Sequence, residues 1–256
     1  MFASVQSELN QVTVFLEKLY RFKSGHLAQL VPDFRLSEAD QHLRPALVLL
    51  AGKLFPQHSL DSRQIVMGGI AQLIFMAQEI HNKITDDCPK SVPQFPVLVG
   101  DYLFAVFCKK LYDHDLLEWL DPLADVICRM NEGGMARRRL IEEGSPREED
   151  YLQVLKLEYG LLTGLSCRIG GHLAGCTREQ EEDLAQFGLR IGMAWGMMKQ
   201  EYPINPKGFL EKGREILASF PFSQGREALL DFVDELEQMS IKLRLTTGSV
   251  PGALAT

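Results

Sequence analysis

The sequence predicts an all-α protein, built as a single large bundle of about eight to ten helices. Apolar residues recur at intervals of three and four along nearly the whole chain, and no segment of useful length alternates with period two. Clusters of proline and glycine separate these apolar stretches, and no internal repeat is visible. At 256 residues, 46% of them hydrophobic, the chain is long enough to bury a sizeable core without disulfides or metals.

The first three expected helices each carry an apolar stripe. The first stripe consists of Val5, Leu9, Val12, Leu16 and Leu19. Ser37 is a good cap for a second helix, whose stripe consists of Leu43, Leu47, Leu50 and Leu54. Pro45 should bend this helix or fall in its first turns. A third helix is expected from about Asp61 to Ile84.

The rest of the chain continues in the same way after one proline-rich break. The segment DDCPKSVPQFP at 86–96 predicts a loop, and GDYLFAVFCKKLY at 100–112 predicts that a helix restarts there. Further helices are expected at about 117–143, 148–174, 179–200, 206–218 and 225–245. We therefore expect one domain over residues 1–246 and a frayed tail over 247–256.

Composition narrows the classes of partner. The net charge of -7 argues against a nucleic-acid partner. Five cysteines, an odd number with no CxxC pair, are typical of free thiols in a reducing compartment. No run of about 18 apolar residues predicts a membrane span, and the N-terminus lacks the pattern of a signal peptide. A cytoplasmic location is the expectation.

Four segments carry a family resemblance when they are taken in order. They are Gln41–Leu47 (QHLRPAL), Ile80–Asp86 (IHNKITD), Leu98–Phe104 (LVGDYLF), and a last stretch that contains CRIGGHLAG and FGLRIGMAW at 167–175 and 187–195. They are similar to the G-K-x-x-R-P-A-L, I-H-D-D-x-x-D, L-A-G-D-Y-L-F, C-R-L-G-A-x-L-A-G and F-G-x-x-L-G-x-A-F motifs of the polyprenyl synthetase family, the trans-isoprenyl diphosphate synthases. The resemblance covers roughly residues 40–202 and implies a helical bundle around a central cavity.

The resemblance also implies a reaction with definite requirements. In this family an allylic diphosphate ionises to a carbocation and pyrophosphate, and the alkene of isopentenyl diphosphate attacks the cation. Magnesium ions neutralise the departing pyrophosphate and are held by carboxylates of two aspartate-rich motifs. In D-D-x-x-D the first and last aspartates are four residues apart, so that they share one helix face.

This sequence departs from the family at most of these positions. The first motif reads Asn82, Lys83 and Asp86, followed by Asp87, so two of its three carboxylates are missing. The second motif falls on Lys199, Gln200 and Glu201, without an aspartate pair. Glu158 stands at the lysine of the family's K-T-A motif, and Gln41 at the lysine of G-K-x-x-R-P. Of the diphosphate-binding set, Arg44 alone is kept.

Three arrangements of the exchanged charges are open. Lys83 and Lys199 could pair internally with Glu158 and close the old metal site. Alternatively, Lys83, Lys199 and Arg44 could bind a diphosphate directly without a metal, or all of these residues could be solvated. Asp86 and Asp87, with Glu201, are weak candidates for a single Mg²⁺. Because adjacent helical residues point about 100° apart, we expect no metal in this chain.

Other residues have a structural and a functional interpretation. Ala77, five residues before the first motif, falls in the region that lines the family's chain-length tunnel, where small side chains leave room for a long product. The basic run Arg137–Arg139 is interpreted as a solvated helix face, with a partner's phosphate or a lipid head group as the alternative. Met193, Met197 and Met198, together with Trp195, are expected in the core.

The functional hypothesis is a non-catalytic subunit of a hetero-oligomeric long-chain prenyl diphosphate synthase. The subunit would stabilise the catalytic chain and set product length, for example for a quinone side chain. It would be inactive alone and bind no cofactor itself, with Mg²⁺ in the catalytic partner. The partner is a catalytic chain or a second copy of this one, and isoprenoid diphosphates are possible ligands. The alternatives are an active but atypical polyprenyl transferase, and an isoprenoid-binding or scaffold protein without catalysis.

Overall fold

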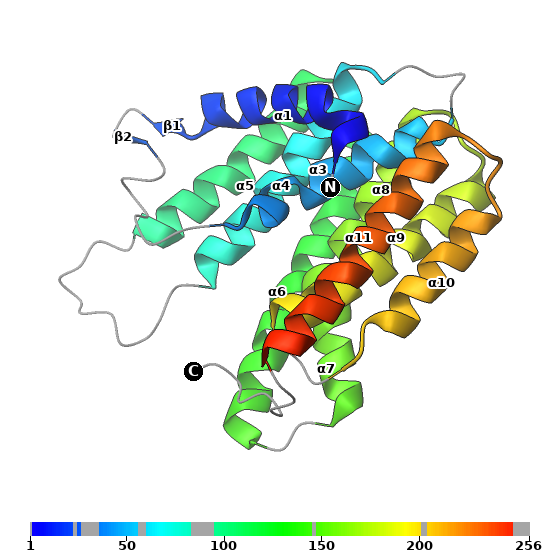
Figure 1. The fold of residues 1–256 in the computed structure, drawn as a ribbon. Coiled ribbons are helices and arrows are strands. Elements are labelled where there is room, and N and C mark those ends of the chain that lie inside the picture. The colour runs from blue at the N-terminus through cyan, green and yellow to red at the C-terminus, as the bar shows by residue number, and fades with distance from the viewer. Residues whose placement is uncertain are drawn as a thin grey trace.

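The protein is an all-α bundle, as the sequence predicts (Figure 1). The computed structural model describes residues 2–22, 25–26, 36–55, 60–82, 95–144, 147–200 and 204–247. Within these ranges the one departure from helical structure is a short antiparallel pair of strands, β1 (Arg21–Phe22) and β2 (Gly25–His26).

The helices follow one another with short connections. The first half of the chain forms a 3-10 turn (Ala3–Val5), α1 (Gln6–Leu19), α3 (Glu38–Lys53), α4 (Ser62–His81), α5 (Phe95–Asp113) and a second 3-10 turn (Leu117–Trp119). The second half forms α6 (Leu120–Glu143), α7 (Glu148–Leu155), a π-helical segment (Lys156–Gly160), α8 (Leu161–Leu173), α9 (Arg178–Lys199), α10 (Lys207–Ala218) and α11 (Gln224–Thr247).

Side-chain caps explain where three of the helices begin. The side chain of Ser37 accepts a hydrogen bond from the backbone N–H of Asp40, as expected for the cap of α3. Reciprocal capping boxes start α4 at Asp61 and Gln64, and α9 at Thr177 and Gln180. Each pair satisfies N–H groups that a helix terminus leaves without an intrahelical partner.

The structure corrects three of the expected boundaries. Helix α5 begins at Phe95, five residues before the predicted restart, because Pro96 fits the first turn of a helix. The long helix predicted at 148–174 contains a π-helical segment, which marks a local change of hydrogen-bond register. Pro45 lies in the interior of α3, two turns from its start. Residues 83–94 and the tail 248–256 lie outside the described residues.

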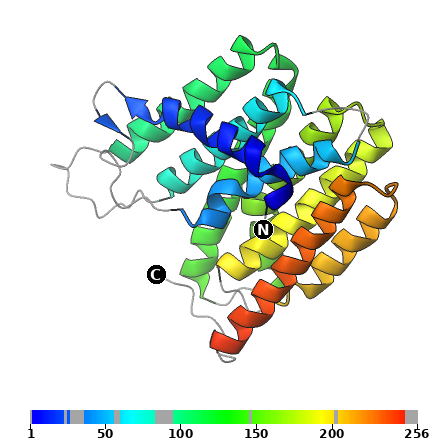
Figure 2. The same cartoon turned by 45° about the horizontal axis from the view of Figure 1, so that its top comes forward.

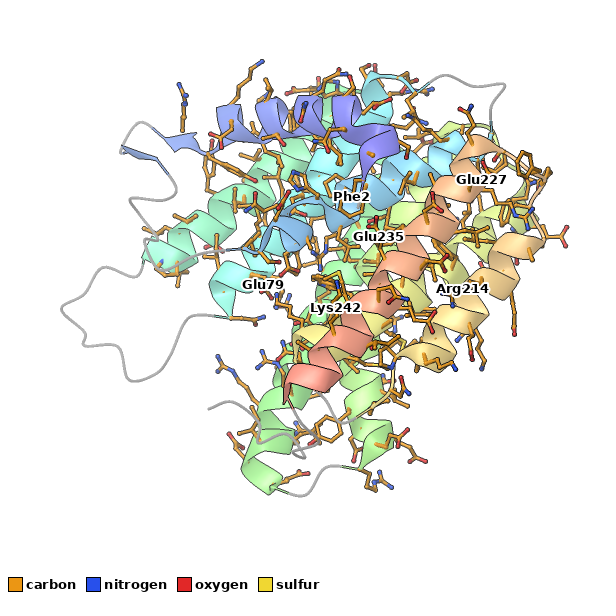
Figure 3. All side chains as sticks on the ribbon, in the orientation of Figure 1. Phe2, Glu79, Arg214, Glu227, Glu235 and Lys242 are labelled. Atoms are coloured by element: carbon orange, nitrogen blue, oxygen red, sulfur yellow. The ribbon has the colours of Figure 1, made fainter. Side chains whose placement is uncertain are left out.

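The core forms where α8 and α9 lie against each other and α3 crosses α8 (Figure 2). Helices α10 and α11 cover the far side of α9, and Arg214 of α10 joins them by ion pairs to Asp234 and Glu237 of α11 (Figure 3). On the other side α4 packs against α1, α3 and α5. Of the helices in the described ranges, none has the length and apolar character needed to cross a bilayer.

Candidate functional site

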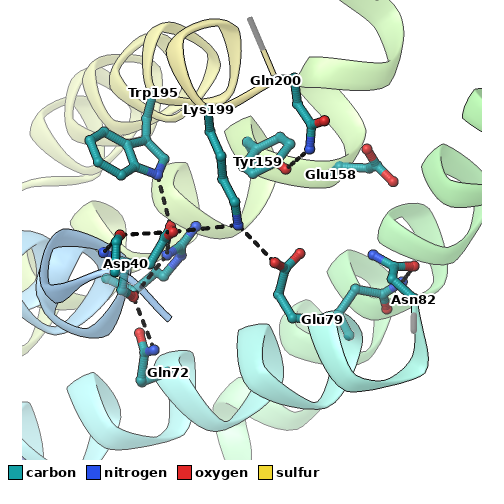
Figure 4. A network of polar contacts seen from close by, with 12 residues as sticks. Asp40, Gln72, Glu79, Asn82, Glu158, Tyr159, Trp195, Lys199 and Gln200 are labelled. Carbon is teal, nitrogen blue, oxygen red and sulfur yellow. Dashed lines mark hydrogen bonds and ion pairs between the residues drawn. The ribbon is translucent and has the colours of Figure 1, made fainter. Parts of the chain in front are cut away.

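The candidate site lies where the two altered motifs face each other inside the bundle (Figure 4). Asn82 caps the C-terminal end of α4, and Lys199 and Gln200 end α9. The π-helical segment supplies Glu158 and Tyr159 to the same place. Segments far apart in the sequence therefore meet as the family resemblance implies. Lys83, Asp86, Asp87 and Glu201 lie outside the described residues.

Lys199 joins α9 to two other helices. Its Nζ lies 2.7 Å from Oε2 of Glu79 on α4 and 3.4 Å from Oδ2 of Asp40 on α3. It also lies 5.0 Å from the centre of the Phe75 ring, within the range of a cation–π contact. Two carboxylates and an aromatic face thus surround a single ammonium group.

Asp40 is the buried acid of this network, with only 4% of its surface exposed. It accepts hydrogen bonds from Nε1 of Trp195 at 2.9 Å and from Oγ of Ser37 at 3.1 Å. Burial by itself would raise the pKa of Asp40, but the charges of Arg44 and Lys199 outweigh it and hold the pKa below its usual range. Asp40 is therefore an ionised structural residue.

Arg44, the expected diphosphate ligand, is turned inward and is 1% exposed. Its Nη1 donates to the backbone carbonyl of Asp40 at 3.2 Å and lies 3.5 Å from Oδ1 of the same residue. The guanidinium carbon lies 3.3 Å from the centre of the Phe75 ring. Burial lowers the pKa of Arg44, and the charge of Asp40 opposes this effect. Diphosphate binding by Arg44 stays a prediction, and in this arrangement the guanidinium is occupied.

Glu158 is paired with an arginine that the sequence did not single out for this role. Nε of Arg137 on α6 lies 3.1 Å from Oε1 and 3.2 Å from Oε2 of Glu158. Burial raises the pKa of Glu158, and Arg137 only partly offsets the shift. The interpretation of Arg137 as part of a solvated basic face is thus wrong, whereas Arg138 and Arg139 are exposed.

A glycine on α6 makes this pairing possible. A Cβ atom at Gly133 would lie 2.8 Å from Cβ of Leu157 and 2.9 Å from Cγ of Glu158, closer than such atoms approach in proteins. Without that Cβ, α6 lies directly against the π-helical segment, and Arg137, one turn along the helix, reaches the carboxylate.

A polar cavity of about 200 Å³ remains between these groups. Its lining includes Gln78, Glu79, Asn82, Arg137, Glu158 and Gln200. Nε2 of Gln78 donates to Oδ1 of Asn82 at 3.4 Å, and Nε2 of Gln200 donates to the Tyr159 hydroxyl at 2.6 Å. The carboxylates on this cavity are matched by an equal number of neighbouring cations, Arg137 and Lys199.

The described residues do not fit magnesium. Mg²⁺ prefers carboxylate oxygens and keeps several of its waters. Here Glu79 and Asp40 face Lys199, and Glu158 faces Arg137. In the part of the chain that the structure describes, no three Asp, Glu, His or Cys side chains come together as metal ligands. The donor set is one of completed ion pairs.

The first and third motif segments also meet. A Cβ atom at Gly100 would lie 2.0 Å from Nε2 of His81, so the glycine leaves the room in which the imidazole sits. His81 also lies 3.6 Å from Oδ1 of Asp101 and 5.6 Å from the Phe104 ring centre. These contacts attach the end of α4 to α5. Ala77 is fully buried in α4, and its expected role in a tunnel stays a prediction.

Sequence reasoning missed three residues of the site. Glu79 and Arg137 carry the partner charges, and Asp40 lies at the centre of the network. One signal was available, because Glu79 precedes Asn82 by three residues and so shares its helix face. Met193, Met197 and Trp195 are buried, as expected for core residues.

Known proteins share this sequence pattern over part of their length. A family model described as polyprenyl synthetase matches residues 27–198. Over 166 residues the chain is 28% identical to a nonaprenyl diphosphate synthase of Mycobacterium tuberculosis, a stretch that makes up 60% of this chain and 49% of that protein. The chain thus spans about half the length of this relative.

Solved structures share the fold. A decaprenyl diphosphate synthase from Rhodobacter capsulatus superposes with a TM-score of 0.76 at 17% identity, covering 92% of this chain and 97% of that one. A deletion mutant of the heterotetrameric geranyl pyrophosphate synthase of mint gives a TM-score of 0.70 at 18% identity, covering 91% and 99%. At these identities the likeness concerns the fold. Since the matched family model covers well over half of the sequence, the chain belongs to the polyprenyl synthetase family.

Proposed function

We propose that this chain is a non-catalytic subunit of a prenyl diphosphate synthase and acts in isoprenoid biosynthesis together with a catalytic chain of the same family. The observation that carries the proposal is the pairing of acids at the site, Glu79 with Lys199 and Glu158 with Arg137. A carboxylate that already faces a fixed cation adds little negative charge for a second cation to bind.

The family's reaction gives this pairing its meaning. As the allylic C–O bond breaks, negative charge grows on the pyrophosphate, and the enzyme must stabilise that charge where it develops. Removing even one such stabilising group typically lowers kcat by about 10²–10³. With most metal ligands replaced, we expect this chain to be inactive alone and Mg²⁺ to act in the catalytic partner.

Direct binding of a diphosphate at this site is less well supported. Arg44 is buried against Phe75, and Lys199 lies between two carboxylates. A diphosphate in the cavity would meet Glu79 and Glu158 at close range. Since like charges repel strongly in a partly buried site, we do not assign metal-free diphosphate binding to the cavity.

The fold is compatible with a heteromeric assembly. One structure with this fold belongs to a heterotetrameric geranyl pyrophosphate synthase. By analogy, this subunit would stabilise the catalytic chain and influence the length of its product. Only the shared fold and the paired site support this role, so the partner must be identified by experiment.

The deciding experiment measures prenyl transfer from farnesyl diphosphate and radiolabelled isopentenyl diphosphate with Mg²⁺. The chain is assayed alone, and after co-expression with a motif-intact homologue from the same genome. No product alone, with a longer product or faster turnover in the mixture than with the homologue alone, is the expected result. In a control, the partner's first aspartate motif is replaced, and all turnover should disappear while the complex still forms.

Two other outcomes would replace the proposal. Turnover by the purified chain alone, increasing with Mg²⁺, would mean an active enzyme that relies on Asp86, Asp87 and Glu201. If the chain neither turns over nor changes the partner's products, yet binds an isoprenoid, the alternative of a binding or scaffold protein would stand. The cavity of about 200 Å³ argues against the latter, because ligand pockets commonly measure about 300–1,000 Å³.

A further inference from the structure

Helix α5 is apolar on both sides, but the rest of the bundle covers only one of them. Among the described elements it packs on α4 and on the 3-10 turn Leu117–Trp119, and it lies at the edge of the molecule (Figure 1). A helix that is apolar all round is normally buried. The uncovered side of α5 therefore indicates a contact with another chain.

The uncovered side is a continuous stripe. It consists of the exposed residues Leu98, Asp101, Tyr102, Ala105, Cys108, Lys109 and Tyr112, which we call the α5 face. At 100° per residue, all seven lie within about 60° of Ala105 around the helix axis. Leu98 and Tyr112, at the two ends of the stripe, are 66% and 69% exposed. Exposed apolar residues that line up along one helix mark an interaction site.

The α5 face is complementary to itself in the reversed direction. Counting outward from Ala105, Asp101 lies four residues before it and Lys109 four residues after it. In the same way Leu98 mirrors Tyr112 at seven residues. When two copies of α5 lie antiparallel with Ala105 facing Ala105, each Asp101 comes opposite the other copy's Lys109. Isologous interfaces require this kind of self-complementarity.

We propose that the α5 face binds the α5 face of a second copy of this chain, antiparallel, with a two-fold axis at Ala105. The small Ala105 side chain lets the two helices approach to about 8 Å, the short end of helix packing distances. Each Leu98 then covers the partner's Tyr112, so four large apolar side chains leave water. This inference goes beyond the proposed function and does not depend on it.

The ion pairs that these residues make within one chain do not oppose the arrangement. Lys109 lies 2.8 Å from Asp113, and Asp101 lies 3.6 Å from His81. The side chains of Lys109 and Asp101 are 69% and 65% exposed. Exposed pairs contribute at most about 1 kcal/mol, so exchanging partners costs little.

The size of the contact sets a further condition. With 19 residues, α5 is about 28 Å long, and a stable interface buries about 800 Å² on each partner. One helix supplies only part of this area. The exposed Leu117 and Leu120, which follow α5 directly, extend the apolar surface.

The test is the mass of the full-length chain in solution, measured by sedimentation over a dilution series. We expect a dimer for the unmodified chain. Because residue 105 faces itself, Ala105→Glu and Ala105→Lys should each raise the dimer Kd by about tenfold or more through like-charge repulsion. Mixing the two variants should restore dimers, since Glu then faces Lys, and this recovery also excludes misfolding of either variant.

A charge exchange tests the register. Asp101→Lys alone places two lysines opposite each other and should weaken the dimer, whereas Asp101→Lys with Lys109→Asp should recover it. The matched control is Lys207→Asp on α10, where the lysine also makes an exposed pair four residues away, with Glu211. This control should leave the dimer unchanged.

Several results would overturn the second-copy proposal. They are a monomer at every concentration, a dimer that tolerates both Ala105 variants, and failure of the mixed variants to associate. A monomer that binds the catalytic chain through Leu98 and Tyr112 would assign the α5 face to that chain, and the proposed function would survive. A monomer that binds lipid vesicles through the same residues would assign it to a membrane surface. Conversely, a confirmed dimer without any effect on a catalytic chain would leave only the proposed function refuted.

Discussion

Nζ of Lys199 lies 2.7 Å from Oε2 of Glu79, so the last residue of α9 reaches α4 one turn before the altered first motif. In the family that the chain belongs to, carboxylates from both sides of this site converge on metal ions. Here one side supplies the cation itself. An ion pair has taken the position of a metal bridge, and it still holds the two helices at a fixed distance.

Replacing Lys199 by Met should destabilise the fold. The change leaves Glu79 and the buried Asp40 facing each other's charge without the ammonium between them. Because Lys199 and Glu79 are about one-fifth exposed, water screens part of the effect, and we expect a loss of about 2 kcal/mol. Urea unfolding measures it. Lys207→Met, at an exposed position on α10, is the control and should change stability by less than about 0.5 kcal/mol.

Asp40→Asn should be more damaging, at about 3–5 kcal/mol, because it leaves the fully buried Arg44 without a counter-ion. Removing both charges in Asp40→Asn with Arg44→Met should cost less than the sum of the single changes, which a double-mutant cycle measures. Additive costs would contradict the coupling.

The pH dependence of Asp40→Asn follows from the lowered pKa of Asp40. The unfolded chain binds this proton more tightly than the folded one, so the stability that Asp40 contributes is present above its unfolded pKa of about 3.9 and is lost as the pH falls below it. The gap between wild type and variant should narrow in that acidic range.

Glu158→Gln should show the opposite trend. Burial raises the pKa of Glu158 in the folded chain, so the folded state binds the proton more tightly than the unfolded one. The stabilising contribution of Glu158 is therefore present below its unfolded pKa of about 4.3 and is lost as the pH rises through the folded pKa. Wild type should lose stability relative to the glutamine variant as the pH rises from about 4 to 7. A constant difference across this range would show that Arg137 compensates the burial fully.

Gly133→Ala should separate α6 from the π-helical segment. The added methyl group would lie under 3 Å from side-chain atoms of Leu157 and Glu158, and we expect a loss of about 1–3 kcal/mol. Gly208→Ala is the matched control, because it lies in the helix α10 with no atom within 4 Å of the new Cβ. That change should stabilise the protein by about 0.5–1 kcal/mol. Thermal unfolding of both variants gives the comparison.

Local signals in the sequence were enough for most of the fold. Ser37 is a strong helix cap by its chemistry alone, and it caps α3 in the structure. The start of α5 was misplaced because a proline-rich stretch favours a loop, whereas Pro96 also fits a first helical turn. The π-helical segment had no visible signal, because its hydrogen-bond register depends on tertiary contacts such as that with Gly133.

The partners in the site were harder to predict than the site itself. Sequence comparison located Lys199 and Glu158, since both stand at positions of the family motifs. It did not locate Arg137, because a run of three arginines on a long helix is usually solvated, and only the third dimension shows which one turns inward. Pairing is set by which helix faces meet, and linear spacing within one helix does not contain that information.

The hydrogen bond from Trp195 to Asp40 joins residues 155 positions apart, which has a consequence for synthesis on the ribosome. At about 5–20 residues per second, roughly 10–30 s pass between the emergence of Asp40 and that of Trp195 and Lys199. During this interval α3 has its own arginine but neither of its later partners. The N-terminal half of the nascent chain therefore cannot complete its polar interior by itself, and it is expected to depend on chaperones until α9 arrives.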